Sequence, residues 1–424
     1  MRRINRRLMP FLFLLYIVAY LDRVNVGYAS LQMTGDLKFT DDIFGFGSGI
    51  FFLGYVLLEI PGTILVEIWS ARKWIARIMI SWGLIAALTG LVRTAHQFYW
   101  ARFLLGVAEA GFFPGVIVYL THWYRGVDRA KAIAMFMSAI PLSFVIGAPI
   151  SAVLMKIHWF GLHGWQWLLI LEGAPAIVLG IVTLFYLTDR PEQATWLPER
   201  EREWIIEELA REKRAKVAAG SDFSVWRALR NPNVLLLMLS YFCGSTCQYG
   251  FGLWLPKMVK NLSGLTTTQS TLVSAIPYLA AWPAMLLVGW NSDRTRERRV
   301  HTSVCLAVSG LALLATQYTG ANVVLGIAMF SIAAMAINGR LSAFWPMPSA
   351  FLGGTAAAAA IGLINCIGNT GGFVGPSIVG FLSTKFGSYA GGVAFLIGSA
   401  FVGAAAVLLV RKSDERKRAQ VTLG

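Results

Sequence analysis

Residues 11–29, FLFLLYIVAYLDRVNVGYA, form an apolar run that contains one adjacent pair of opposite charges, Asp22 and Arg23. A helix of about 20 predominantly apolar residues is long enough to cross the hydrocarbon core of a bilayer. A charge at that depth is costly, and it tends to mark a path for an ion or a substrate. The run therefore predicts a membrane-spanning helix that carries a functional centre.

Apolar runs of similar length recur along the whole chain of 424 residues, of which 56% are hydrophobic and 14% are charged, and the mean hydropathy is +0.60. Soluble domains contain about 25% charged residues. Strands of a membrane barrel would be about ten residues long with alternating polarity. We therefore predict an all-α integral membrane protein with about twelve spans, at residues 9–31, 43–67, 75–94, 98–121, 130–157, 166–188, 233–257, 268–290, 300–318, 322–345, 353–385 and 388–411.

The net charge of +15 is concentrated in alternate loops. These loops carry Arg2, Arg3, Arg6, Arg7, Arg72, Lys73, Arg77, Arg125, Arg129, Lys131, Arg294, Arg296, Arg298, Arg299, Arg411, Lys412, Arg416, Lys417 and Arg418. The asymmetry follows the positive-inside rule, so we expect both termini in the cytoplasm and the protein in the cell inner (plasma) membrane. It favours the lipid bilayer as a partner and argues against nucleic acid. The first apolar run is too long for a signal peptide, so we expect an uncleaved span.

The one long polar stretch, residues 189–232, separates six expected spans from six. Within it, residues 198–216, PEREREWIIEELAREKRAK, begin with proline, carry acids early and bases late, and have a narrow apolar stripe. This pattern predicts an amphipathic helix on the cytoplasmic face. We expect it to act as a strut that joins two halves, and the alternative is a surface for a protein partner.

Two pairs of landmarks recur at the same offset of 227 residues: Gly62 with Gly289, and Pro149 with Pro376. Transporters are commonly built from such internal repeats, with the substrate site between the halves near the midplane. We therefore expect two six-helix pseudo-repeat bundles, residues 1–188 and 233–424, joined by the linker 189–232.

A second pair of charges lies in residues 101–115, ARFLLGVAEAGFFPG, where Arg102 and Glu109 stand seven residues apart. Two helical turns place both on one face of a helix. With Asp22 and Arg23, they put four ionisable groups into two apolar helices, which favours a carrier of a charged solute and a proton. Arg102 either faces a pocket or a gate, or reaches outward to the membrane surface.

The loop GWNSDRTRERR, residues 289–299, resembles the loop signature of the major facilitator superfamily, and the loop that follows Gly62 resembles a divergent first copy. An acid in such a loop can cap a helix end and pair with arginine, which would latch the halves in one state. The alternative is charge that only sets the topology. The expected gating residues are Glu67, Arg72, Asp293, Arg294 and Arg298.

Three further stretches, YLDRVNVGYA (20–29), FFLGYVLLEIPG (51–62) and INCIGNTGGFVGP (364–376), together with 101–115, resemble the anion:cation symporter family. That family includes bacterial carriers of tartrate, galactonate and hydroxyphenylacetate. The resemblance implies proton-coupled uptake of a small organic carboxylate, such as a sugar acid, a tartrate-like acid or an aromatic acid. Residues 339–354, GRLSAFWPMPSAFLGG, keep Trp345 but change its surroundings, so the anion itself is not identified.

Arg23 is the first candidate for the substrate carboxylate, because a guanidinium matches a carboxylate with two hydrogen bonds. The resemblance assigns the same role to it and implies that Asp22 and Glu109 carry protons. We expect Asp22 to pair with Arg23 and Glu109 with Arg102. A substrate at Arg23 would compete for its charge and leave the carboxylate to bind a proton.

Polar and aromatic side chains in other spans are further candidates to line the substrate pocket, although each also suits helix packing. They are Tyr55, Asn365, Asn369, Gln248 and Trp345, with Glu59 and Tyr249 as additions. Glu59 precedes Pro61, so its carboxyl alternatively serves a freed backbone group or a helix contact.

Other functional classes lack support in the sequence. The chain has no HExxH, Walker or GxSxG motif, and its histidines show no metal-ligand spacing, so we expect neither an enzyme nor a cofactor or metal. We expect a monomer. A proton-coupled exporter, an antiporter or a passive uniporter of the same fold is the main alternative, and a membrane sensor is a more distant one.

Overall fold

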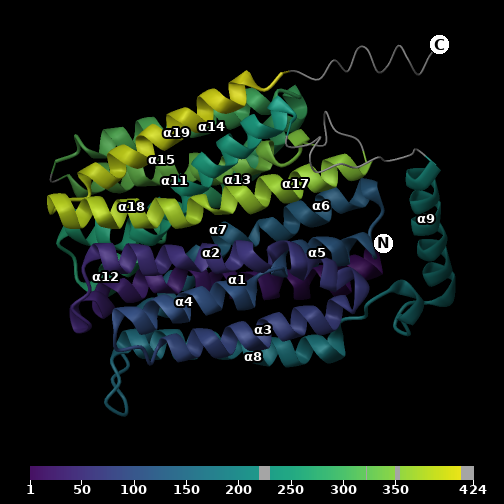
Figure 1. Cartoon of the computed structure of the whole chain (residues 1–424), viewed down its shortest axis with the longest axis horizontal. Helices are drawn as coiled ribbons and strands as arrows, with labels where there is room; N and C mark the ends of the chain where they lie inside the picture. The colour runs from purple at the N-terminus through teal and green to yellow at the C-terminus, as the bar shows by residue number, and fades with distance from the viewer. Residues whose placement is uncertain (219–229, 321, 349–353, 412–424) are drawn as a thin grey trace.

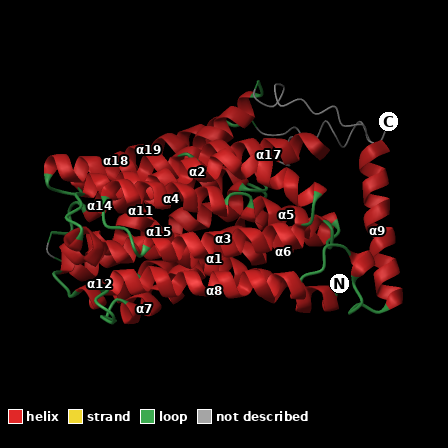
Figure 2. Cartoon of the chain, turned by 60° about the horizontal axis from the view of Figure 1, so that its bottom comes forward, coloured by secondary structure: helices red, strands yellow, loops and turns green. Residues whose placement is uncertain are grey.

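The computed structural model describes residues 1–218, 230–320, 322–348 and 354–411. Every regular element in these ranges is a helix, and most of the helices run side by side in one bundle (Figure 2). Ten candidate helical spans within the described residues are long and apolar enough to cross a membrane. The predicted all-α membrane fold is therefore confirmed.

Helices of the first half correspond to the expected spans, but two of those spans are divided. Span four consists of α4 and α5, and span five consists of α6 and α7. The first division lies at Gly111, whose φ of +85° suits glycine and ends the α4 hydrogen-bonding pattern. The helices are α1 (Arg2–Asp36), α2 (Asp41–Ile68), α3 (Ala71–Thr89), α4 (Ala95–Glu109), α5 (Phe112–Thr121), α6 (Gly126–Met137), α7 (Ala139–Leu154) and α8 (Gly164–Tyr186).

The second half also contains two divided spans, its second and its fifth. The helices are α11 (Pro232–Ser263), α12 (Thr267–Val273), α13 (Ile276–Thr295), α14 (Arg298–Thr316), α15 (Val323–Phe344), α17 (Gly354–Asn369), α18 (Gly371–Phe386) and α19 (Ala390–Leu409). The fifth span of each half is thus a broken helix: α6 with α7, and α17 with α18. We use "N-terminal half" for α1–α8 and "C-terminal half" for α11–α19, and the division of the chain into two repeated domains stays a prediction.

The linker forms the expected amphipathic helix, α9 (Glu199–Ala218), after a short 3-10 turn, η1 (Pro191–Gln193). Figure 1 shows α9 beside the end of the bundle where the N-terminus lies. Its Ile205 is buried, and the Glu212 carboxylate accepts hydrogen bonds from the Gly126 backbone N–H (2.9 Å) and from Arg129 (3.3 Å). The helix is therefore docked on the N-terminal half. Residues 219–229, the remainder of the linker, lie outside the described residues.

Helices α2 and α4 cross at small residues. A Cβ added to Gly106 would collide with the carbonyl oxygen of Phe51, and one added to Gly54 would collide with that of Phe103. Close backbone approach is the usual role of glycine in packed membrane helices. This crossing brings Tyr55 of α2 towards Glu109 of α4.

The two halves meet closely at the end of the bundle opposite the N-terminus. There the Asp41 carboxylate of α2 binds Lys257 of α11 (2.7 Å), Ser383 of α18 (2.7 Å) and Tyr389 just before α19 (2.8 Å). A Cβ at Gly45 of α2 would lie 2.5 Å from the Pro376 carbonyl oxygen of α18, so these helices are in backbone contact. We call Asp41, Lys257, Ser383 and Tyr389 the interhalf clamp.

Candidate functional site

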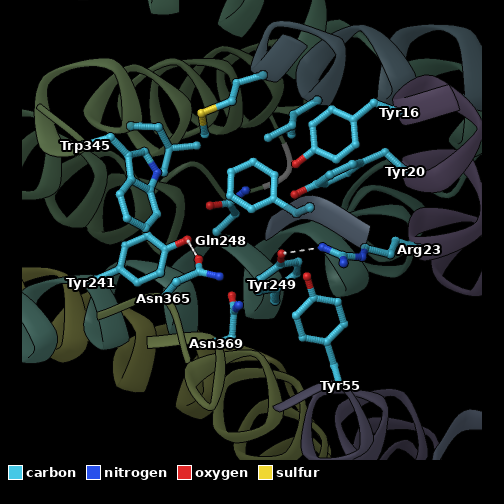
Figure 3. Close-up of a pocket in the computed structure, with 14 residues that line it drawn as sticks. Tyr16, Tyr20, Arg23, Tyr55, Tyr241, Gln248, Tyr249, Trp345, Asn365 and Asn369 are labelled. Atoms are coloured by element: carbon cyan, nitrogen blue, oxygen red, sulfur yellow. Dashed lines mark hydrogen bonds between the residues drawn. The ribbon is translucent and has the colours of Figure 1, made fainter. Parts of the chain in front are cut away.

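A cavity lies between the two halves, and Figure 3 shows its lining. Arg23 lies on one side, and Tyr241, Asn365 and Trp345 lie on the other. The cavity is lined by Tyr16, Tyr20, Arg23, Tyr55, Phe113, Met137, Ile140, Tyr241, Gln248, Tyr249, Leu341, Trp345, Asn365 and Asn369.

Arg23 is the charged group of this cavity. One of its guanidinium nitrogens lies 2.5 Å from the Glu109 carboxylate, and another donates a hydrogen bond of 3.2 Å to the Tyr249 hydroxyl across the halves. The rings of Tyr20 and Tyr55 lie 5.1 and 5.0 Å from the guanidinium carbon. Aromatic faces at these distances stabilise a cation, and they fix where the guanidinium points.

Asp22 points away from Arg23, although the two are adjacent in sequence. Its carboxylate accepts hydrogen bonds from the Trp82 indole N–H of α3 (2.6 Å) and from the Asn25 amide (3.2 Å). Consecutive helical residues point about 100° apart, so only one of such a pair can face the cavity. The expected pairing of Asp22 with Arg23 was therefore wrong, and Glu109 takes that place.

Arg102 is buried in α4, with 2% of its surface exposed, and its guanidinium carbon lies 5.1 Å from the Phe51 ring centre. It helps to line a second cavity that shares Tyr20, Arg23, Gln248 and Tyr249 with the first. Seven residues of helix rise, about 10 Å, separate Arg102 from Glu109 along α4, and the Glu109 carboxylate forms its ion pair with Arg23 instead. The expected pairing of Glu109 with Arg102 was wrong, and burial excludes an outward-reaching Arg102.

The opposite wall consists mainly of amides and aromatic rings from the C-terminal half. The Asn365 amide donates to the Glu59 carboxylate of α2 and accepts a bond of 3.4 Å from the Tyr241 hydroxyl. The Trp345 ring lies 4.8 Å from the Tyr241 ring, and Asn369 also lines the cavity. Glu59 thus makes a contact between helices of the two halves, which was one of the alternatives considered for its carboxyl group.

The expected gating residues lie at the ends of helices. Arg298 binds Asp293 (3.4 Å) and the Pro346 carbonyl oxygen (3.2 Å), and Arg294 lies over the Trp290 ring at 5.4 Å. The backbone N–H of Arg72 donates to the Asp189 carboxylate at 2.8 Å. None of these contacts joins the two halves, so a latch between the halves stays a prediction. The side chain of Glu67 lies outside the described part of the chain.

The sequence analysis missed two buried charged residues and one ion pair. Arg340 of α15 and Glu172 of α8 are buried charged residues within expected spans, with 0% and 6% of their surface exposed. A charge inside an apolar run is the same signal that singled out Arg23, so both were detectable. The pairing of Asp41 with Lys257 joins residues 216 positions apart, and the sequence of one chain carries no signal for it.

Residues that the structure describes contain no cluster of three or more His, Cys, Asp and Glu side chains that could hold a metal ion. Cys243, Cys247 and Cys305 are buried free thiols, and Cys366 is a free thiol that is partly buried. The arrangement offers one guanidinium, several amides and hydroxyls and two nearby carboxylates. This set suits reversible binding of a polar anion and exchange of protons.

Comparison with known proteins gives the same fold and a transport role. Residues 12–376 match the sequence profile of the Major Facilitator Superfamily. A protein of Agrobacterium vitis named "Putative tartrate transporter" is 45% identical over 416 residues, which cover 97% of this chain and 95% of that protein. The "Quinolone resistance transporter" of Acinetobacter baumannii is 36% identical, over 99% of this chain and 96% of that protein.

A similar solved structure is that of a bacterial homologue of the human lysosomal transporter Spinster, in an inward-facing and occupied conformation. It superposes with a TM-score of 0.77 over 97% of this chain and 99% of that one, at 17% sequence identity. At this identity the likeness concerns the fold alone.

Proposed function

Since the chain belongs to the major facilitator superfamily and is a transporter rather than an enzyme, we propose that it moves a small organic carboxylate together with a proton, by alternating access. The observation that carries this proposal is the ion pair of Arg23 with Glu109 beside the cavity. Arg23 can bind the carboxylate of a substrate, Glu109 can bind a proton, and the two side chains are in direct contact.

The substrate carboxylate competes with Glu109 for Arg23. When the substrate binds, Arg23 shares its charge with a second carboxylate, and Glu109 loses part of the attraction that holds it ionised. Since Glu109 is buried, with 2% of its side chain exposed, it then favours its protonated form. Substrate and proton are therefore bound together, which is the condition for symport.

Asp22 is a second proton carrier in this scheme. It lies behind Arg23, held by Trp82 and Asn25, and does not line either cavity. Its position suits a relay step between Glu109 and the interior of the N-terminal half. Tyr55, Gln248, Asn365 and Asn369 supply hydrogen bonds to the hydroxyl and carboxylate oxygens of the substrate.

With both termini in the cytoplasm of the inner membrane, the interhalf clamp faces the outside. The structure then corresponds to a state that is closed to the outside, and the breaking of the clamp accompanies opening. The described contacts of Arg298 with Asp293, at the other end, belong to the gate that closes when the clamp opens. In this scheme, alternating access consists of the clamp and the gate at the opposite end opening in turn.

The proposal is tested by uptake into proteoliposomes of a panel of labelled acids: tartrate, galactonate, a hydroxybenzoate and pantothenate. Each acid is measured with and without an inward proton gradient, beside the Arg23→Ala variant. We expect gradient-driven accumulation of at least one acid, and loss of it in Arg23→Ala. If no acid accumulates with the gradient, the symporter proposal is wrong.

Export is the second candidate, since one relative is named for quinolone resistance. An exporter would accumulate its substrate inside inside-out vesicles against a gradient, in exchange for protons that move in the opposite direction. Counter-directed flow of proton and quinolone, without uptake of any acid, would favour export over symport.

A further inference from the structure

Arg340 is a charge that the mechanism above does not use. It lies on α15, its surface is 0% exposed, and its guanidinium packs against the backbone of α11. A Cβ at Gly244 would lie 2.5 Å from the Arg340 guanidinium carbon and 2.7 Å from one of its nitrogens. Glycine at position 244 therefore leaves the space that the guanidinium fills.

No described carboxylate forms an ion pair with Arg340. Its surroundings are neutral: the Tyr241 ring at 5.7 Å, and the Cys247 and Cys305 thiols. Its Nε and one terminal nitrogen have no hydrogen-bond partner among the described residues. It is also the one buried charged side chain of the described C-terminal half. A buried charge without a counterion costs several kcal/mol, so it persists where function requires it.

A hydrogen bond connects Arg340 to the cavity. Its other terminal nitrogen donates to the Gln248 amide oxygen at 3.1 Å. Gln248 lines both cavities, beside Arg23. With its oxygen bound to Arg340, the amide keeps its N–H donors for the cavity, and the positive charge behind it strengthens them.

We propose that Gln248, held and polarised by Arg340, forms a second carboxylate subsite, so that the transported anion is a short hydroxylated dicarboxylate. One carboxylate binds Arg23 of the N-terminal half, and the other binds Gln248 of the C-terminal half. A substrate with a charge at each end therefore bridges the halves and favours their closure around it. Arg340 is a positioning residue that selects for the second charge. This inference rests on the proposed function.

The test compares two acids that differ in one charged group: tartrate, and threonate, in which a CH₂OH group replaces one carboxylate. Affinity is measured by thermal stabilisation of the purified protein and by competition in proteoliposome uptake. Wild type is expected to bind tartrate about tenfold or more tightly than threonate, the difference expected for a hydrogen bond to a charged group. Arg340→Met should remove this preference by weakening tartrate binding and leaving threonate binding nearly unchanged.

Arg340→Lys and Arg93→Met serve as controls. Lysine keeps the charge without the planar fork, so part of the preference should return. Arg93 is an exposed arginine, and its replacement should leave both affinities unchanged. If Arg340 had only a structural role, its replacement would disturb the whole cavity and weaken the binding of both acids equally.

The outcomes separate the two proposals. Equal binding of both acids by wild type, or equal loss of both in a folded Arg340→Met or Arg340→Lys variant, overturns the dicarboxylate subsite. Proton-driven uptake of threonate or another monocarboxylate in that case leaves the proposed function intact. Failure of every acid to bind or accumulate overturns both.

Discussion

Arg23 of α1 and Glu109 of α4 are joined by an ion pair of 2.5 Å at the wall of the cavity between the halves. The same guanidinium donates to Tyr249 of the C-terminal half, so the pair lies where the halves meet. A change in the charge of either partner should therefore alter both substrate binding and the contact between the halves. Two predictions follow from this position.

Replacement of Glu109 by glutamine should uncouple transport from the proton. Glutamine cannot bind or release a proton, but it keeps the shape of the side chain beside Arg23. We expect accumulation driven by a proton gradient to be lost and exchange of labelled for unlabelled substrate to continue, both measured in proteoliposomes. Glu192→Gln, an exposed site, should behave as wild type. Full concentrative uptake by Glu109→Gln would contradict the assignment.

Removal of Arg23 alone should destabilise the protein more than removal of the whole pair. Arg23→Met leaves a buried carboxylate without its partner, which costs about 3–5 kcal/mol where such a pair is broken. The double variant Arg23→Met with Glu109→Gln leaves no unpaired charge there. We expect a lower melting temperature for the single variant in detergent. Equal melting temperatures would show that the pair is not coupled in the folded state.

Much of the fold follows from hydropathy, because each crossing of a bilayer needs a long apolar run. The expected spans coincide with helices or helix pairs, and the linker helix begins near Pro198 as expected. Hydropathy did not reveal the break at Gly111, because a left-handed glycine changes the backbone without changing polarity. Residues that line a cavity were partly identified, since Arg23, Tyr55, Gln248, Asn365 and others lie there.

Which side chains contact one another in the site was harder to predict than which residues belong to it. Asp22 and Arg23 are neighbours in sequence, and the helix turns them to different partners. Arg340 occurs within an expected span, but its burial depends on the absence of a side chain at Gly244, nearly a hundred residues earlier. Contacts between distant helices arise from packing, and one sequence does not encode them in a local pattern.

The interhalf clamp should control the balance between the two states of the transporter. Asp41→Asn removes the charge that binds Lys257 and keeps a side chain of the same shape. We expect more of the protein to open at this end, so that a cysteine at position 369, in a background without other cysteines, reacts faster with an impermeant thiol reagent.

Asp42→Asn is the matched control for the clamp. It removes an acid from the same first turn of α2, so the helix-dipole effect is similar. The hydrogen bond that position 42 makes to Thr384 uses its backbone N–H, which the substitution keeps. Equal labelling rates for Asp41→Asn, Asp42→Asn and the parent would mean that the clamp does not hold the halves.

The crossing of α2 and α4 should tolerate no added side chain at Gly106. Gly106→Ala places a methyl group against the Phe51 carbonyl, and the helices must separate to accept it. Overpacking of this kind costs about 1–3 kcal/mol of folding stability.

Because the same crossing brings α2 alongside the helix that carries Glu109, separation of the helices should also weaken substrate binding. Gly398→Ala, on α19, has no atom within 4 Å of the new methyl and should leave melting temperature and uptake unchanged. A Gly106→Ala protein that melts and transports like Gly398→Ala would show that the helices can shift at no cost.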